Sequence, residues 1–210
     1  MDTQIRGLHH VTAITSSAEK NCRFFTDILG LRMIKKTVNQ DDIETYHLYF
    51  TDDTGAPGTD MTFFDFPRIP KGTKGTNSIS RTGFRVPTDA SLEYWAQRFT
   101  DLAVAHGEIK ERFGKKYLEF HDYDDQLFQL VSDEKNQGVA GGTPWKNSNV
   151  PAEHAIFGLG PTIVTVAKFD HLKLVLENLL GFKETAAEGS MHQFEVGDCL
   201  LYTSDAADEL

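Results

Sequence analysis

The sequence has 210 residues, with 21 Lys and Arg against 31 Asp and Glu, and a formal net charge of −10. Hydrophobic residues make up 40% of the chain, which is ordinary for a globular protein, and no apolar run is long enough to cross a membrane. The acidic balance, without clustered Lys or Arg, argues against a nucleic-acid partner and against an anionic membrane. Cys22 and Cys199 are too few for a disulfide framework, which favours a cytoplasmic location.

Residues 5–66 predict a strand, a helix and three further strands. The strand is expected at residues 7–14, where the two faces alternate. Ser16 as N-cap and Glu19 three residues later fit a capping box, and Gly30 is placed to end the helix. One face of that helix carries Ala18, Cys22, Phe25 and Leu29. Three strand-like runs follow, at residues 31–38, 43–51 and 60–66.

The same order recurs in the rest of the chain. Residues 78–132 predict a second unit with a strand at 78–86, a helix from Asp89, and strands near 108–113, 116–121 and 126–132. Residues 133–154 are rich in Gly, Asn and Pro and are expected to form a linker. A third unit is expected over residues 155–198, with a strand within 156–166, a helix capped by Asp170 and a strand at 191–196.

Short motifs repeat at a fixed spacing between the first and third units. Gly7-Leu8 matches Gly158-Leu159, and Leu29-Gly30-Leu31 matches Leu180-Gly181-Phe182, each pair 151 residues apart. Self-similarity at a fixed period is typical of repeated structural units. We therefore predict an α+β fold of tandem βαβββ units forming curved mixed sheets, with the third unit incomplete and a fourth missing.

The end of the sequence has an unusual composition. Residues 199–210 resemble the conceptual translation of an adaptor used in DNA sequencing, the alternative being an acidic, Ala-rich natural terminus. We expect this segment to be an artefactual tail that lies outside the fold. On this interpretation the chain is truncated at its C-terminus, and the N-terminal domain covers residues 5–132.

Three stretches carry a family resemblance, at residues 7–14, 57–64 and 143–158. Together with the repeated βαβββ order, they resemble the vicinal oxygen chelate superfamily, which includes glyoxalase I, bleomycin-resistance proteins and extradiol dioxygenases. Within it, the chain resembles the ring-cleaving dioxygenases that act on hydroquinone-type substrates. The resemblance implies a mononuclear Fe(II) site, with Mn(II) as an alternative metal, held by two histidines and one glutamate. Such a site leaves positions open for substrate and dioxygen.

The resemblance assigns roles to three residues of the first strand. His10 matches the family's metal ligand, His9 a second-sphere histidine that acts as acid, base or oxygen stabiliser, and Thr12 a polar residue of the same pocket. The remaining histidine and the glutamate are expected beyond residue 198. The corresponding pairs in the other units are Ser80-Arg81 and Gly160-Pro161, and Gln129 stands at the glutamate position of the second unit.

Other chemistry-bearing residues receive structural interpretations. His47 and His192 are read as partly buried, satisfied histidines, and Cys22 as a small core residue. Phe63 and Phe64 are expected to line an aromatic pocket.

The resemblance leaves three functions open for the parent protein. The first is ring cleavage of a small hydroquinone- or catechol-like aromatic, with insertion of both atoms of O2. The second is a glyoxalase-type metal isomerase or lyase, and the third is a non-catalytic protein that sequesters a ligand. Whether the protein forms a homo-oligomer, and whether the truncated chain is active, stay open.

Overall fold

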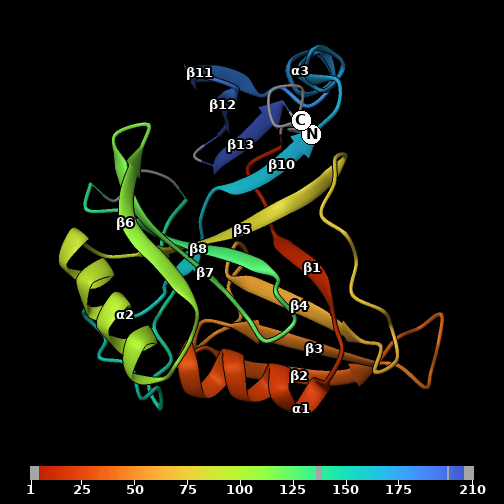
Figure 1. Cartoon of the computed structure of the whole chain (residues 1–210), viewed down its shortest axis with the longest axis vertical. Coiled ribbons are helices and arrows are strands. Elements are labelled where there is room, and N and C mark those ends of the chain that lie inside the picture. Colours follow the sequence, from red (N-terminus) through yellow and green to blue (C-terminus); the bar gives the residue numbers. More distant parts are fainter. Residues whose placement is uncertain (1–4, 136–138, 198, 206–210) are drawn as a thin grey trace.

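The computed structural model describes residues 5–135, 139–197 and 199–205. Three segments of the chain each contain a strand, a helix and three more strands, in that order (Figure 1). In each segment the first strand pairs in parallel with the last. The strand order within each segment is therefore first, fourth, third, second, so that the first strand lies at one side of the group.

The first unit forms a separate four-stranded sheet. Its elements are β1 (His10–Thr15), α1 (Ala18–Arg23), the π-helical turn η1 (Phe24–Ile28), β2 (Arg32–Val38), β3 (Tyr46–Thr51) and β4 (Asp60–Asp65). The N-cap of α1 is Ser17, whose side chain accepts a hydrogen bond from the Lys20 backbone, and not Ser16 as predicted. Ser16 Oγ instead lies 2.6 Å from a carboxylate oxygen of Asp124, a residue of the second unit. This contact between units decides which serine caps the helix.

The second unit matches its predicted elements closely. It consists of β5 (Ser78–Val86), α2 (Asp89–Asp101), β6 (His106–Arg112), β7 (Lys115–His121) and β8 (Leu127–Ser132). Thr88 caps α2 by accepting a hydrogen bond from the Ser91 backbone at 3.1 Å.

The third unit contains five strands, three more than the two predicted: residues 156–166 hold two strands, and those at Lys183–Glu188 and Cys199–Asp205 were not predicted. Its elements are β9 (Gly158–Leu159), β10 (Thr162–Val166), α3 (Phe169–Asn178), β11 (Lys183–Glu188), β12 (Met191–Val196) and β13 (Cys199–Asp205). Asp170 is not the N-cap of α3, because the helix starts at Phe169, whose ring stacks on His192 with the centroids 3.8 Å apart.

Strand β13 lies in the segment that was expected to fall outside the fold. It pairs with both β10 and β12, and Leu201 and Thr203 are buried. An alternating apolar segment can complete a sheet wherever two strands offer unpaired edges. The origin of residues 199–210 stays a prediction, but the structure uses part of them as a strand.

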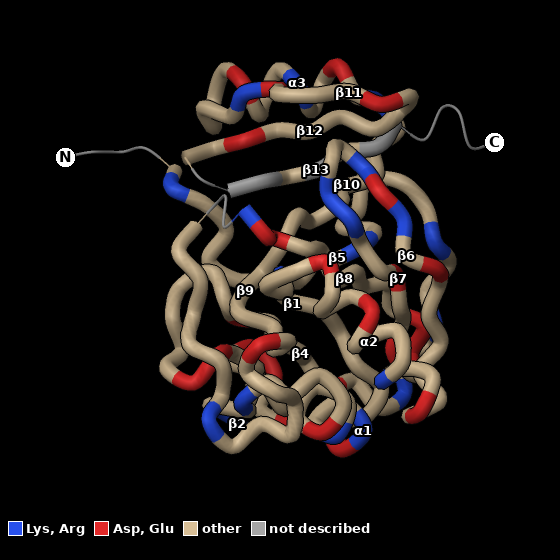
Figure 2. The backbone as a smooth tube through the Cα atoms, turned by 90° about the vertical axis from the view of Figure 1, so that its left-hand side faces the viewer, with Lys and Arg blue, Asp and Glu red and all other residues tan. Residues whose placement is uncertain are grey.

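The second and third units share one sheet, whereas the first unit does not. Strands β5 and β10 pair in antiparallel fashion and join both units into a nine-stranded sheet that runs up the molecule in Figure 1. Helix α2 covers β6, β7 and β8, and α3 packs against β11 and β13. Figure 2 shows acidic and basic residues on many elements of the chain, and β2 carries only basic ones, Arg32, Lys35 and Lys36.

One core unites the first two units, and its centre is aromatic. Phe25 from η1 is fully buried and lies within 6.4 Å, centroid to centroid, of Phe50, Phe63, Phe84 and Phe128. The third unit has its own smaller core around Phe194. Each aromatic side chain of this size buries a large apolar area, so Phe25 is a main source of cohesion between the first two units.

The segment expected to be a linker lies against the first two units. Its described residues form no helix or strand before β9. Within it Val150 is buried in the shared core, as are Ala155 and Ile156 directly after it, and the Thr143 backbone donates to Asp52 at 2.8 Å. The domain boundaries themselves stay predictions. None of the helices in the described ranges is long and apolar enough to span a membrane.

Candidate active site on the open face of the first sheet

The first sheet has one face covered by helix and one face open. Val11 and Thr15 of β1 are buried, whereas His10, Thr12 and Ile14, which alternate with them, are exposed. The parallel register places His10 beside Asp60 and Thr12 beside Thr62. The open face carries His10, Thr12 and Ile14 from β1, Asp60, Thr62 and Phe64 from β4, and His47 and Tyr49 from β3. All three residues assigned from the sequence, His9, His10 and Thr12, therefore lie at this part of the first sheet.

The imidazoles of His9 and His10 contact each other. Their Nδ1 atoms are 3.2 Å apart, and the two rings meet edge to face at 88°. Adjacent residues of a strand point to opposite faces, but β1 begins at His10, so His9 lies outside the strand and this rule does not apply to it. One Nδ1 must carry a proton and donate it, and the other Nδ1 must be unprotonated and accept, so the contact couples the tautomers of the two rings. When His10 is the donor through Nδ1, its Nε2 carries a free lone pair, as a metal ligand requires.

Asp60 supplies a carboxylate beside the histidine pair. Burial raises the pKa of Asp60, and the proximity of His9 and His10 acts in the opposite direction. Its Oδ1 atom is buried and has no hydrogen-bond partner among the described residues. The site predicted from the sequence does not include Asp60, which the pairing of β4 with β1 places beside His10.

A row of polar side chains runs across the open face from β3 to β1. Tyr49 Oη lies 2.9 Å from His47 Nδ1, and His47 Nε2 lies 3.1 Å from Thr62 Oγ1. Thr62 Oγ1 in turn lies 2.9 Å from Thr12 Oγ1. His47 is half-buried and satisfied, as predicted, but it lies on the open face with Thr12. Successive side chains of a strand point to opposite faces, and this rule, applied to the Tyr-His-Leu-Tyr run of β3, could have placed His47 on the face of Tyr49 and opposite the apolar Leu.

The equivalent positions of the second and third units are closed. Gln129 is fully buried, and its amide donates to the Pro161 backbone carbonyl at 3.1 Å. Opposite it on β5, a Cβ on Gly83 would come within 2.4 Å of the same carbonyl oxygen. Arg81 is held by an ion pair with Glu119. Pairing of β5 with β10 thus covers, in the second and third units, the positions that correspond to the exposed His10 and Thr12 of the first.

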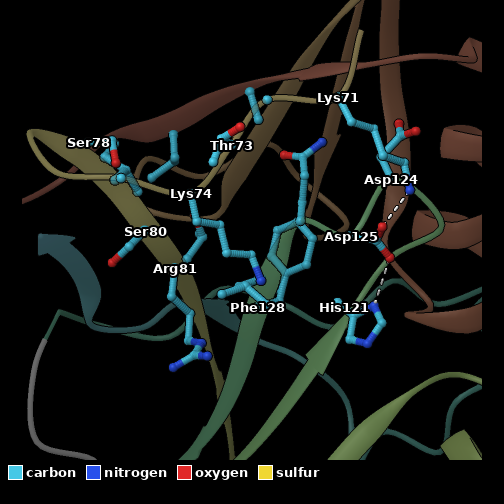
Figure 3. Close-up of a pocket in the computed structure, with 18 of the residues that line it drawn as sticks. Lys71, Thr73, Lys74, Ser78, Ser80, Arg81, His121, Asp124, Asp125 and Phe128 are labelled. Atoms are coloured by element: carbon cyan, nitrogen blue, oxygen red, sulfur yellow. Dashed lines mark hydrogen bonds and ion pairs between the residues drawn. The ribbon is translucent and has the colours of Figure 1, made fainter. Parts of the chain in front are cut away.

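A cavity of about 660 Å³ adjoins Thr12 between the first two units (Figure 3). It is lined by residues 11–13 of β1, residues 71–75, strand β5 and the turn between β7 and β8. Figure 3 shows Lys71 bound to Asp125, which also lies 3.5 Å from His121. A cavity of about 150 Å³ is enough for benzene, so this space exceeds what one aromatic ring needs.

The described residues do not form a complete metal site. Among them, no group of three or more His, Cys, Asp or Glu side chains could hold a metal ion. His10 offers one imidazole whose Nε2 makes no hydrogen bond within the described part of the chain. An imidazole is a donor type that Fe(II) and Mn(II) sites use.

Fold and site together define a class of protein. Residues 7–130 match the model of the Glyoxalase/Bleomycin resistance protein/Dioxygenase superfamily, and the chain belongs to that superfamily. The chain is 43% identical over 185 residues to the Bacillus subtilis protein named "Putative ring-cleaving dioxygenase MhqA", covering 88% of this chain and 58% of that protein. It is 29% identical over 198 residues to chlorohydroquinone/hydroquinone 1,2-dioxygenase of Sphingobium indicum, covering 93% and 60%. The predicted resemblance to ring-cleaving dioxygenases is confirmed.

Solved structures agree with the fold. A crystal structure described as a "putative dioxygenase" from Bacillus subtilis superimposes with a TM-score of 0.88 at 31% identity, covering 96% of this chain and 64% of that one. Glyoxalase I from Zea mays gives 0.69 at 11% identity, covering 96% and 68%, and shares the fold alone. The chain spans about three fifths of the length of the curated relatives it matches.

Proposed function

We propose that this chain is part of a metal-dependent ring-cleaving dioxygenase, and that His10 is one of its iron ligands. The proposed substrate is a small hydroquinone- or catechol-like aromatic, which receives both atoms of O2. The observation that supports this most directly is the open face of the first sheet, where His10 and Thr12 stay accessible while the equivalent positions of the other units are closed. The named relatives support the same class of reaction.

Each residue of the site has a distinct part in this proposal. His9 holds the His10 ring through the 3.2 Å contact between Nδ1 atoms, and it can carry a proton to or from an oxygen bound nearby. Thr12 contributes a hydroxyl between the open face and the adjoining cavity, where a ring has room. Iron held by two histidines and one carboxylate leaves positions open for substrate and dioxygen, which is the chemistry the metal supplies.

The remaining ligands are proposed to lie in a further unit that continues the chain beyond residue 198. The relatives are longer than the matched region, so they have room for such a unit. In the second and third units, the first strands pair with each other and cover the inner face. A fourth unit paired with β1 in the same way would bring its own first strand next to His10.

Oxygen consumption by the complete gene product, loaded with Fe(II) under anaerobic conditions, tests this proposal. With hydroquinone as substrate, we expect stoichiometric O2 uptake that His10→Ala abolishes. His171→Ala, an exposed histidine on α3, is the matched control and should leave the uptake unchanged. Uptake that survives His10→Ala would refute the assignment of the ligand. Turnover without O2 would favour the isomerase or lyase, and ligand binding without turnover would favour the sequestering protein.

A further inference from the structure

The polar row on the open face forms one continuous hydrogen-bonded chain. It links Tyr49, His47, Thr62 and Thr12 through three contacts of 2.9, 3.1 and 2.9 Å. Exposure changes along it: Thr62 is 1% exposed, His47 and Tyr49 are half-buried, and Thr12 faces solvent. Of the two ends of the row, Thr12 is therefore the more exposed, and its hydroxyl is the more accessible to a ligand.

Aromatic packing fixes the orientation of the His47 ring. Its centroid lies 4.2 Å from that of Tyr49 and 4.0 Å from that of Phe64. The ammonium of Lys35 lies over the Tyr49 ring, 5.3 Å from its centroid. Since the His47 ring is held between its neighbours, Nδ1 stays with Tyr49 and Nε2 stays with Thr62. What is left to decide is which group of each pair donates the hydrogen bond.

The chemistry of the two ends decides that direction. A phenol, with a pKa near 10, is a much stronger hydrogen-bond donor than an aliphatic hydroxyl. Tyr49 therefore donates to His47 Nδ1, and a neutral His47 must then carry its proton on Nε2 and donate to Thr62. Burial, first of all, and the nearby ammonium of Lys35 lower the pKa of His47, which favours the neutral ring. Thr62, having accepted at its oxygen, donates onward to Thr12.

We propose that His47 is a positioning residue, which acts through Thr62 to leave the Thr12 hydroxyl free to donate a hydrogen bond to an oxygen of the bound ligand. The identity of the ligand rests on the proposed function, but the donor-to-acceptor direction of the hydrogen bonds from Tyr49 to Thr12 does not. With the reverse direction, Thr12 would donate to Thr62 and could offer the ligand only a lone pair. A deprotonated phenol, or an oxygen that gains negative charge, is stabilised by a hydrogen-bond donor, so such a ligand needs the Thr12 hydroxyl as a donor.

The tautomer of His47 is the direct test, and it uses the 210-residue chain without metal or substrate. Long-range proton–nitrogen NMR spectra of the imidazole should show a proton on Nε2 and a bare Nδ1. Tyr49→Phe removes the donor and should convert His47 to a mixture of tautomers. Tyr46→Phe, at an exposed tyrosine of the same strand, is the control and should change nothing. A proton on Nδ1 in the unaltered chain would overturn the proposal.

A pair of substitutions at Thr62 tests the consequence in the complete enzyme. Thr62→Val keeps the shape and breaks the row, and Thr62→Ser keeps the hydroxyl. We expect kcat to fall about tenfold in the valine variant with a smaller change in KM, and the serine variant to keep most of the activity, since one oriented hydrogen bond contributes roughly a factor of ten. Equal losses in both variants would show that only packing matters and would overturn the proposal. Absence of any dioxygenase activity would instead refute the proposed function and leave the NMR result standing.

Discussion

A buried ion network holds the start of the third unit to the second, and its carboxylate can be removed without changing shape. Asp133 accepts from Arg85 Nη1 at 3.2 Å and from Lys115 Nζ at 3.1 Å, and its side chain is 1% exposed. Arg85, itself 9% exposed, also donates through Nε to the Leu159 carbonyl in β9. Asp133→Asn keeps the volume but leaves two cations without their charge partner.

The expected cost follows from this burial. Removing one member of a buried ion network destabilises a protein by about 3–5 kcal/mol, because the remaining charge stays desolvated. For a chain of this size that corresponds to a fall in Tm of roughly 10 °C. The magnitude is a large part of the 5–15 kcal/mol or so that usually separates folded from unfolded states.

Urea unfolding, followed by the fluorescence of the fully buried Trp95, measures the change in the free energy of unfolding. Glu19→Gln is the matched control, because it removes a carboxylate from the exposed Glu19–Arg23 pair, whose side chains are 75% and 71% exposed. That variant should stay within about 0.5 kcal/mol of the unaltered chain. If Asp133→Asn cost no more than Glu19→Gln, the network would not be a source of stability, and the reasoning from burial would be refuted.

Two further predictions concern stability. Gly30→Ala should destabilise the chain by about 1–3 kcal/mol more than Gly181→Ala in thermal unfolding, because both glycines have φ of +72° but only at Gly30 would a Cβ meet Ser148 Oγ, at 2.3 Å. Equal costs would contradict the packing argument. Burial raises the pKa of Asp122 to about 6, above its ordinary 3.8, so the folded state keeps a proton that the unfolded state has lost, and stability should fall as pH rises from 4 to 6. Asp122→Asn should remove that part of the slope in urea titrations at each pH, and an unchanged slope would contradict it.

Local signals predicted the elements well and their ends less well. The helix face with Phe25 and Leu29 is buried, and Gly30 ends that helix in the left-handed conformation, as predicted. The errors fell at helix starts, where contacts distant in sequence decide which residue caps the helix. Ser16 is hydrogen-bonded to Asp124, and Phe169, the first residue of α3, stacks on His192.

The candidate site shows the same division. His10 and Thr12 were identified from their motif and lie together on one face. Phe63 and Phe64 were expected to line one pocket, but Phe63 is fully buried in the core and only Phe64 lies on the open face, with its ring centroid 4.0 Å from that of His47. Adjacent strand residues point to opposite sides, so they cannot line the same surface.

The sequence by itself determined the order of strands and helices, because periodicity and turn residues act over a few neighbours. It also carried the histidine pair that marks the first unit. Only the tertiary structure decided which sheet faces are open, because that depends on pairing between β5 and β10, which lie far apart in the chain. The same long-range register brings Asp60, Thr62 and His47 to the face of His10 and Thr12, since a strand's neighbours are set by the sheet and not by the strand alone.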